Sequence, residues 1–121
     1  MLHDKRDMAH LLDMYNYCVI VKQFVKGVKY YHFSINKEKL MAVERGIEII
    51  GEASNRVSDE TKDILQNIPW VEIRGLRNRL AHEYDDIKTT TLYKIAKNDI
   101  QILLKELKKI KELKKHIAVK S

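Results

Sequence analysis

Residues that interrupt regular structure are scarce in this sequence of 121 residues, which contains four glycines and one proline. Because both residue types break helices and mark turns, their scarcity favours long helices joined by few turns. Hydrophobic residues make up 45% of the chain and charged residues 33%, a composition that is typical of globular proteins and excludes a disordered chain. The length is that of one ordinary domain, so we expect a single domain over residues 1–121 with one core.

Cysteine and long apolar runs are also nearly absent. Cys18 is the single cysteine, so no disulfide can form within the chain, and a reducing compartment is expected. The longest apolar runs, such as residues 18–21, fall far short of the roughly 20 residues that a membrane-spanning helix needs. Residues 1–7 mix charges of both signs and lack the apolar core of a signal peptide. We therefore expect a cytoplasmic protein that does not associate with membranes.

The patterns that hold metals and phosphates are missing as well. The sequence has five histidines: His3, His10, His32, His82 and His116. None of them forms a pair at four-residue spacing, and Cys18 has no neighbouring ligand, so no metal site is expected. There is no glycine-rich phosphate loop, because Gly46 and Gly51 lie inside a helical pattern, where small residues are expected to permit close helix packing. The sequence thus predicts neither a metal ion nor a cofactor.

The chain is basic, with 23 Lys and Arg residues against 17 Asp and Glu residues and a formal net charge of +6. Such a surplus favours anionic partners, although solubility alone would also account for it. Six lysines gather near the C-terminus: Lys105, Lys108, Lys109, Lys111, Lys114 and Lys115. They form either a solvent-exposed helix face or a basic surface that contacts the phosphate backbone of a nucleic acid. Two interpretations also fit the aromatic side chains: they pack in the core or at an interface, or they stack on nucleic-acid bases. These residues are Tyr15, Tyr17, Tyr30, Tyr31 and Phe33.

Apolar residues at three- and four-residue spacing predict two long helices in the first half of the chain. The first spans about residues 5–26 and ends near Gly27. Residues 28–35 are predicted to be an irregular link rich in aromatics. Asn36 is a plausible N-cap of the second helix, which extends to about Val57.

The second half is predicted to hold three further helices. Ser58 caps a short helix that ends near Leu65, and Pro69 opens the next helix, which extends from Val71 to about Tyr84. Residues 85–91 are predicted to form a turn, and a last helix spans about residues 90–117. No stretch alternates convincingly between apolar and polar residues, as a strand would. The predicted fold is therefore all-α, an antiparallel up-down bundle of about four to five helices.

The stretch from Arg77 to Tyr84 carries the residues best suited to chemistry. Asn78 and His82 are four residues apart, so they lie on nearly the same face of a helix. Arg77 and His82 are five residues apart, about 140° around a straight helix, and converge poorly within one chain. A twofold dimer that pairs this helix with its symmetry mate would meet that geometric need. Taken alone, the stretch also fits an ordinary surface helix without chemistry.

Arg77-Asn78-Arg79-Leu80-Ala81-His82-Glu83-Tyr84 resembles the motif of the HEPN superfamily, and in particular of its HepT branch of toxin–antitoxin ribonucleases. That motif has Arg, usually followed by Asn, then His after four to six intervening residues; the HepT branch adds Tyr two residues later. Residues 42–53 resemble the second helix of the family, and residues 68–76 resemble the start of its motif helix. The likeness covers about residues 40–87, and the flanking helices match only in length and character.

The resemblance implies the toxin of a type VII-like toxin–antitoxin module, an RNA endonuclease that needs no metal and acts as a homodimer. Arg77, Asn78 and His82 would be its catalytic residues. Cleavage by the 2′-hydroxyl of the RNA needs only proton transfer, which suits His82, and stabilisation of phosphate charge, which suits Arg77. Asn78 could orient the histidine or bind the substrate. The products would carry a 2′,3′-cyclic phosphate and a 5′-hydroxyl.

Tyr84 has a separate implied role as the residue that a cognate MNT-type nucleotidyltransferase antitoxin modifies with AMP. The new phosphate would occupy Arg77 and the adenosine would block the RNA. Without the resemblance, Tyr84 would be taken as an aromatic residue packed at the end of a helix. Two alternatives stay open: a non-catalytic HEPN module that binds nucleotides or RNA, and a docking partner of the nucleotidyltransferase.

Overall fold

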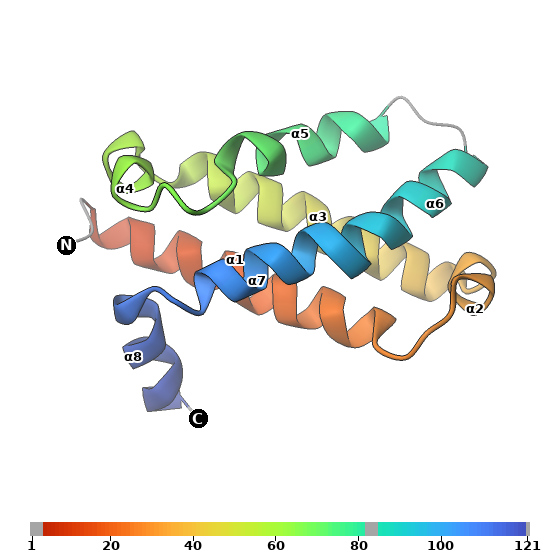
Figure 1. The fold of residues 1–121 in the computed structure, drawn as a ribbon, viewed down its shortest axis with the longest axis horizontal. Helices are drawn as coiled ribbons and strands as arrows, with labels where there is room; N and C mark the ends of the chain where they lie inside the picture. Colours follow the sequence, from red (N-terminus) through yellow and green to blue (C-terminus); the bar gives the residue numbers. More distant parts are fainter. Residues whose placement is uncertain (1–3, 82–84, 121) are drawn as a thin grey trace.

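The computed structural model describes residues 4–81 and 85–120, and every regular element within them is helical (Figure 1). The elements are α1 (Lys5–Val25), α2 (Tyr30–Ser34), α3 (Lys37–Arg56), α4 (Asp59–Ile64), α5 (Trp70–Ala81), α6 (Asp85–Lys94), the π-helical turn η1 (Ile95–Asp99), α7 (Ile100–Leu107) and α8 (Lys111–Lys120). The prediction of an all-α fold is confirmed. No helix in these two ranges is long and apolar enough to cross a membrane.

The long helical segments run up and down along the bundle (Figure 1). α1 and α3 pack closely as an antiparallel pair, α5 covers α3, and the segment α6–η1–α7 returns across α1. The short helices α2, α4 and α8 lie at the ends. The core is formed by side chains from all of the long segments, and its largest fully buried members are Phe33, Leu11, Met14, Ile47, Ile50, Ile95, Ile100, Leu103, Leu107, Leu113, Val21 and Val25. This arrangement confirms the predicted up-down bundle.

The helix ends in the first half follow from local chemistry. Asn36 caps α3, since its side chain accepts a hydrogen bond from the Lys39 amide at 3.0 Å. Ser58 caps α4 by accepting from the Thr61 amide at 3.3 Å. α1 ends two residues before Gly27, whose φ of 69° lies in the left-handed region that glycine adopts without strain. These predicted caps and ends are confirmed.

The close contact between α1 and α3 depends on Gly46. A Cβ atom added at Gly46 would lie 2.6 Å from Cγ2 of Val21. The predicted role of this glycine in close helix packing is therefore confirmed. At Gly51 the same prediction is wrong, because an added Cβ would meet nothing within 4 Å.

Asp7 joins the start of α1 to the start of α4 and is only 2% exposed. Its carboxylate accepts hydrogen bonds from the Ser58 amide at 2.9 Å, from Ser58 Oγ at 2.6 Å and from Thr61 Oγ1. Burial alone would raise the pKa of this carboxyl, but the hydrogen bonds from Ser58 and Thr61 outweigh it and hold the pKa below its ordinary value. A buried charge is tolerated here because several donors satisfy it.

Two predicted irregular segments are helical in the structure. The link predicted for residues 28–35 contains α2, which buries Phe33. The turn predicted for residues 85–91 is wrong, since α6 begins at Asp85. Contacts with the rest of the bundle stabilise α6: Lys88 pairs with Glu44 of α3, and Tyr93 donates a hydrogen bond to the Val28 carbonyl at 2.6 Å.

The single long helix predicted for residues 90–117 is also wrong, because it is divided by η1 and by a break at residues 108–110. In an unbroken helix, Leu113 would lie about 120° around the axis from Leu107 and would leave the core. The break turns α8 away from α7 (Figure 1), and Leu113 is fully buried. Burial of the Leu113 side chain therefore stabilises the broken helix relative to a continuous one.

Candidate functional site

The motif helix α5 is fixed at its start by the loop that follows α4. The indole Nε1 of Trp70 donates a hydrogen bond to the Leu65 carbonyl at 3.0 Å. One face of α5 then carries buried residues at three- and four-residue spacing, namely Ile73, Leu76 and Leu80. This apolar stripe faces α3 and the α6–η1–α7 segment. The core therefore sets the orientation of α5 about its own axis.

The opposite face of α5 points into solvent. Val71 is 73% exposed, and Arg74 and Asn78 are exposed on the same side at three- and four-residue spacing. Asn78, one of the three predicted catalytic residues, is thus accessible to a large substrate.

The other predicted site residues are placed only in part. Arg77 lies in the third turn of α5, and the helix extends to Ala81, which confirms the predicted helical support for Arg77 and Asn78. The side chain of Arg77 is outside what the structure describes, and His82 and Tyr84 lie outside the described residues. The convergence of these side chains stays a prediction.

Arg79, inside the motif, makes the contact that joins the motif helix to the returning segment. Its Nη1 lies 3.3 Å from Oδ2 of Asp99, in the π-helical turn η1. A π turn inserts an extra residue into a helix, and such turns are frequent at functional sites. Ile95, the first residue of the turn, and Ile100, directly after it, are both fully buried, while Asp99 stays partly exposed toward α5.

Sequence reasoning assigned no role to Arg79 or Asp99. The available signal was the single acidic residue between Lys88 and Lys105, in a segment whose other charged residues are lysines. A single carboxylate in a segment whose other charged residues are lysines indicates a specific basic partner. The structure is needed to identify that partner as Arg79.

The helix that follows the motif is held as firmly as α5. Tyr30 and Thr90 share a hydrogen bond of 2.9 Å between their hydroxyl oxygens, which joins α2 to α6. With the Lys88–Glu44 ion pair, this contact fixes α6 against both α2 and α3. Both α5 and α6 are therefore anchored to the rest of the bundle.

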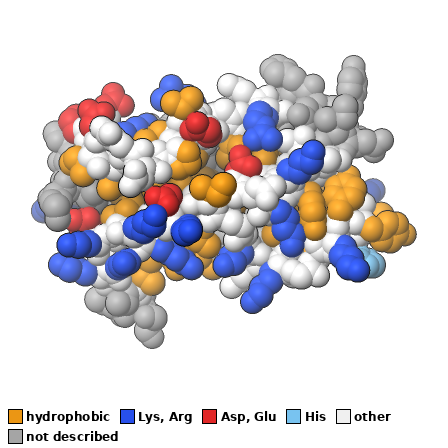
Figure 2. Space-filling model, in the orientation of Figure 1, with side chains coloured by type: hydrophobic (Ala, Val, Ile, Leu, Met, Phe, Trp, Pro, Cys, Tyr) orange, Lys and Arg blue, Asp and Glu red, His pale blue; other side chains and the backbone are white. Residues whose placement is uncertain are grey.

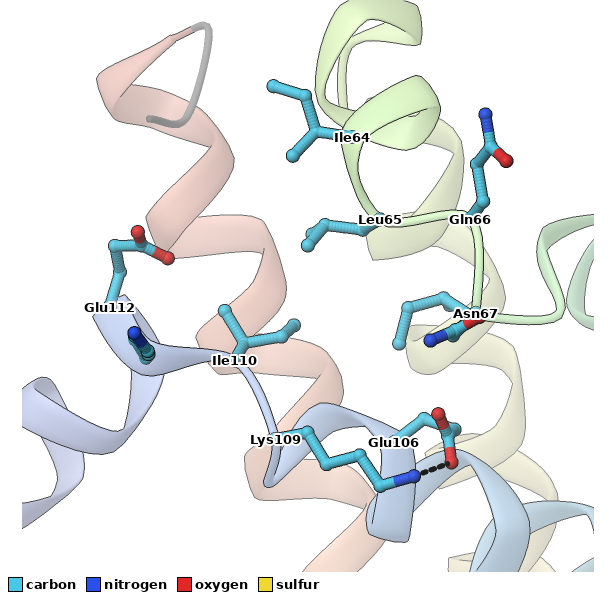
Figure 3. A pocket seen from close by; sticks show the side chains of 10 residues that line it. Ile64, Leu65, Gln66, Asn67, Glu106, Lys109, Ile110 and Glu112 are labelled. Atoms are coloured by element: carbon cyan, nitrogen blue, oxygen red, sulfur yellow. Dashed lines mark hydrogen bonds and ion pairs between the residues drawn. The ribbon is translucent and has the colours of Figure 1, made fainter.

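A cavity of about 450 Å³ lies between the α4–α5 loop and the α7–α8 junction (Figure 3). Leu65 and Ile110 give it apolar walls, and an ion pair between Lys109 and Glu106 at 2.9 Å lies on its rim. It sits at the end of the bundle away from the C-terminal end of α5 (Figure 1), and no motif residue lines it. This cavity is separate from the candidate site. Within the described ranges, no group of three or more His, Cys, Asp or Glu side chains could hold a metal ion.

The sequence profile of a family described as "Ribonuclease HepT-like" matches residues 14–110. Among curated proteins, "Putative RNase MJ1380" of Methanocaldococcus jannaschii is 40% identical over 104 residues, which cover 85% of this chain and 95% of the relative. "Probable ribonuclease HepT" of Thermococcus cleftensis is 30% identical over 103 residues, which cover 85% of this chain and 94% of the relative. No solved structure matches the chain. The resemblance to this family is thereby confirmed, and the chain belongs to the HepT-like ribonuclease family of the HEPN superfamily.

Proposed function

We propose that this protein is the toxin of a toxin–antitoxin module and cleaves RNA as a metal-independent, homodimeric endonuclease. The observation that carries the proposal is the position of the motif. Its first residues, Arg77 and Asn78, lie on a helix whose buried face is fixed by the core and on which Asn78 faces solvent, in a chain of a ribonuclease family.

The proposed reaction uses the 2′-hydroxyl of the RNA as its nucleophile. His82 accepts the 2′ proton while the 2′ oxygen bonds to phosphorus, and the bond from phosphorus to the 5′ oxygen breaks. The leaving 5′ oxygen takes a proton from an imidazolium, and the 2′,3′-cyclic phosphate remains on the other fragment. Histidine titrates near neutral pH and suits both transfers. Arg77 stabilises the charge on the phosphate oxygens through its planar guanidinium.

A homodimer would bring the separated groups together. The five-residue spacing of Arg77 and His82 disfavours their convergence within one straight helix. The exposed stripe of Val71, Arg74 and Asn78 supports a contact across α5, because a twofold axis would cover the apolar Val71 with its counterpart. One cleft would then receive groups from both copies.

Tyr84 is proposed as the control point. A cognate nucleotidyltransferase antitoxin of the MNT type would transfer AMP from ATP to it. The phenolic oxygen bonds to the α-phosphorus, and pyrophosphate leaves. Because Tyr84 lies two residues from His82, the added phosphate and adenosine would compete with RNA for the same groups.

Cleavage of RNA in the presence of EDTA tests the catalytic proposal. The unaltered protein should generate 2′,3′-cyclic phosphate ends, and Arg77→Ala and His82→Ala should lose cleavage while keeping the helical circular dichroism and the dimer mass. Arg6→Ala and His116→Ala, which remove exposed residues at the other end of the bundle, are the matched controls and should cleave normally. Retained cleavage in both motif variants contradicts the mechanism. RNA or AMP binding without any cleavage by the unaltered protein would favour a non-catalytic binding module instead.

A further inference from the structure

Two tyrosines form a fixed aromatic pair beside the helix that follows the motif. The rings of Tyr30 and Tyr93 meet edge to face, with centroids 5.4 Å apart and planes at 77°. Their hydroxyls are bonded to Thr90 Oγ1 and to the Val28 carbonyl, respectively. Contacts within the fold therefore explain the positions of both rings.

Packing does not account for the next residue. Tyr31 is 69% exposed, and its ring lies at 80° to the ring of the exposed His32, with centroids 5.4 Å apart. Phe33, two residues later, is fully buried, so α2 already has its core anchor. Tyr30 and Ile35, at the start of α2 and directly after it, are exposed as well. Such a group of exposed large apolar side chains is typical of a contact with another molecule.

Lysines surround this aromatic group. The Nζ of Lys97 lies 5.6 Å from the centroid of the Tyr93 ring. Lys29 follows Val28, whose carbonyl binds the Tyr93 hydroxyl, and both Lys26 and Lys29 are exposed. Figure 2 shows hydrophobic side chains at the right of this face, over α2, with Lys and Arg side chains beside them.

Lysines also outnumber acidic residues in the C-terminal part of the chain. Residues 88–117 contain nine lysines and three acidic residues. Two of the acids have basic partners, since Asp99 pairs with Arg79 and Glu106 with Lys109. In Figure 2 the Lys and Arg side chains extend across the lower half of the face, while Asp and Glu side chains gather most densely over α4 at the upper left. Charge of one sign along such a length complements a polyanion.

We infer that the α2–α6 surface, formed by Lys26, Lys29, Tyr30, Tyr31, Tyr93 and Lys97, binds single-stranded RNA next to the motif. The inference rests on the proposed function and assigns the binding surface for its substrate. Single-stranded nucleic acids are bound by exposed aromatic rings, on which bases stack, within basic grooves that neutralise phosphates. A base stacks on Tyr31, and phosphates lie against Lys29 and Lys97.

The α2–α6 surface lies close enough to the motif along the chain for one RNA strand to contact both. α6 begins at Asp85, directly after Tyr84. Tyr93 lies eight residues further, about 12 Å along the helix axis. An RNA strand engaged at residues 77–84 would therefore cross the α2–α6 surface within a few nucleotides.

Binding of fluorescent single-stranded 2′-O-methyl RNA, measured by fluorescence anisotropy, tests the inference on the unaltered protein, because this RNA lacks the nucleophilic hydroxyl and is not cleaved. Tyr31→Ala should weaken binding by about 5- to 100-fold, the loss of one stacked base, and Tyr31→Phe should retain it. Lys29→Ala combined with Lys97→Ala should weaken binding and reduce the slope of log K against log salt by about 0.7 for each phosphate contact. Lys5→Ala, at the other end of the roughly 30 Å long α1, is the matched control and should bind normally.

The outcomes separate this inference from the proposed function. Weakened binding in the variants of the α2–α6 surface, together with no cleavage of ordinary RNA by the unaltered protein, would support the surface and contradict the ribonuclease. Cleavage with equal binding by all variants would support the ribonuclease and overturn the surface. No binding of the probe by the unaltered protein would overturn it too. If Tyr31→Ala leaves RNA binding unchanged but alters the mass in analytical ultracentrifugation, Tyr31 belongs to a protein interface, and the inference is wrong.

Discussion

Arg79 of the motif helix and Asp99 of the π-helical turn form an ion pair that connects the end of α5 to the segment packed beside it, with Nη1 and Oδ2 3.3 Å apart. Both side chains are partly exposed, so the pair should contribute only about 0.2–1 kcal/mol. We predict that Asp99→Asn speeds amide hydrogen exchange at Leu80 and Ala81 by up to about fivefold at low salt. The effect should shrink in 1 M salt because exposed charges are screened.

The control for this prediction is Glu48→Gln, which removes a partner of the exposed Arg45 on α3. This variant should leave exchange at the end of α5 unchanged. If Asp99→Asn speeds exchange equally in α3 and α5, the residue contributes to global stability and does not specifically hold the motif helix.

Asp7 predicts a specific dependence of stability on pH. Its pKa is lowered in the folded protein by hydrogen bonds from Ser58 and Thr61, so the folded state favours the charged carboxylate more than the unfolded state does. The resulting stability is fully present above the unfolded pKa, near 3.9, and is lost as pH falls through the folded pKa. Asp7→Asn should lower the free energy of unfolding at pH 7 by about 1–3 kcal/mol.

Urea unfolding at several pH values between 2 and 7 measures this contribution. Asp13→Asn, which alters an exposed carboxylate on the same helix, is the control and should change stability by less than about 0.5 kcal/mol. Equal stability of Asp7→Asn and the unaltered protein at pH 7 would contradict the role assigned to the buried hydrogen bonds.

The ends of α1, α3 and α4 could be predicted from the sequence because local signals and packing agree there. Asn36 and Ser58 are cap residues in front of apolar periodic segments, and Gly27 ends α1. Each element is specified by residues close to it in the chain.

The helices α2 and α6 and the break before α8 could not be predicted, because contacts between residues distant in the sequence decide them. The Thr89-Thr90-Thr91 run has a weak intrinsic helix preference. Nevertheless α6 forms, because Thr90 shares a hydrogen bond with Tyr30 and Tyr93 donates one to the Val28 carbonyl. These partners lie 60 and 65 positions earlier in the sequence. The break before α8 has no glycine or proline to mark it and follows from the burial of Leu113. The candidate site was found from the motif residues alone, but the Arg79–Asp99 pair and the exposed Tyr31 needed the fold.

Gly46 and Gly51 offer a matched test of helix packing within α3. Gly46→Ala should lower the free energy of unfolding by about 1–3 kcal/mol, because its Cβ would overlap the buried Val21. Gly51→Ala should raise it by up to about 1 kcal/mol, because alanine favours a helix and the new Cβ meets nothing within 4 Å. Combining Gly46→Ala with Val21→Ala should cost less than the sum of the two single losses. Additive losses would show that the two residues do not limit the approach of α1 to α3.

Cys18 should be unreactive while the protein is folded. The side chain is fully buried, and burial raises the pKa of its thiol to about 12. Because the thiolate is the reactive form, we expect iodoacetamide at pH 8 to modify Cys18 only at the rate at which the core opens. Addition of urea above the unfolding midpoint should make the reaction complete. Rapid modification of the folded protein would indicate that the packing of α1 opens locally.

Tyr84 carries the proposed regulation and can be tested by intact mass. Incubation with ATP and the cognate nucleotidyltransferase should add one or more units of about 329 Da, each the mass of AMP less water, to the unaltered protein and none to Tyr84→Phe, since transfer needs the phenolic oxygen. Tyr31→Phe, which keeps an exposed aromatic ring but lacks its hydroxyl, is the matched control and should be modified normally. The modified protein should lose RNA cleavage, because the added phosphodiester competes for Arg77. AMP mapped to another tyrosine, or full cleavage by protein modified at Tyr84, would contradict the proposed switch while leaving the proposed catalytic chemistry of Arg77 and His82 to stand on its own test.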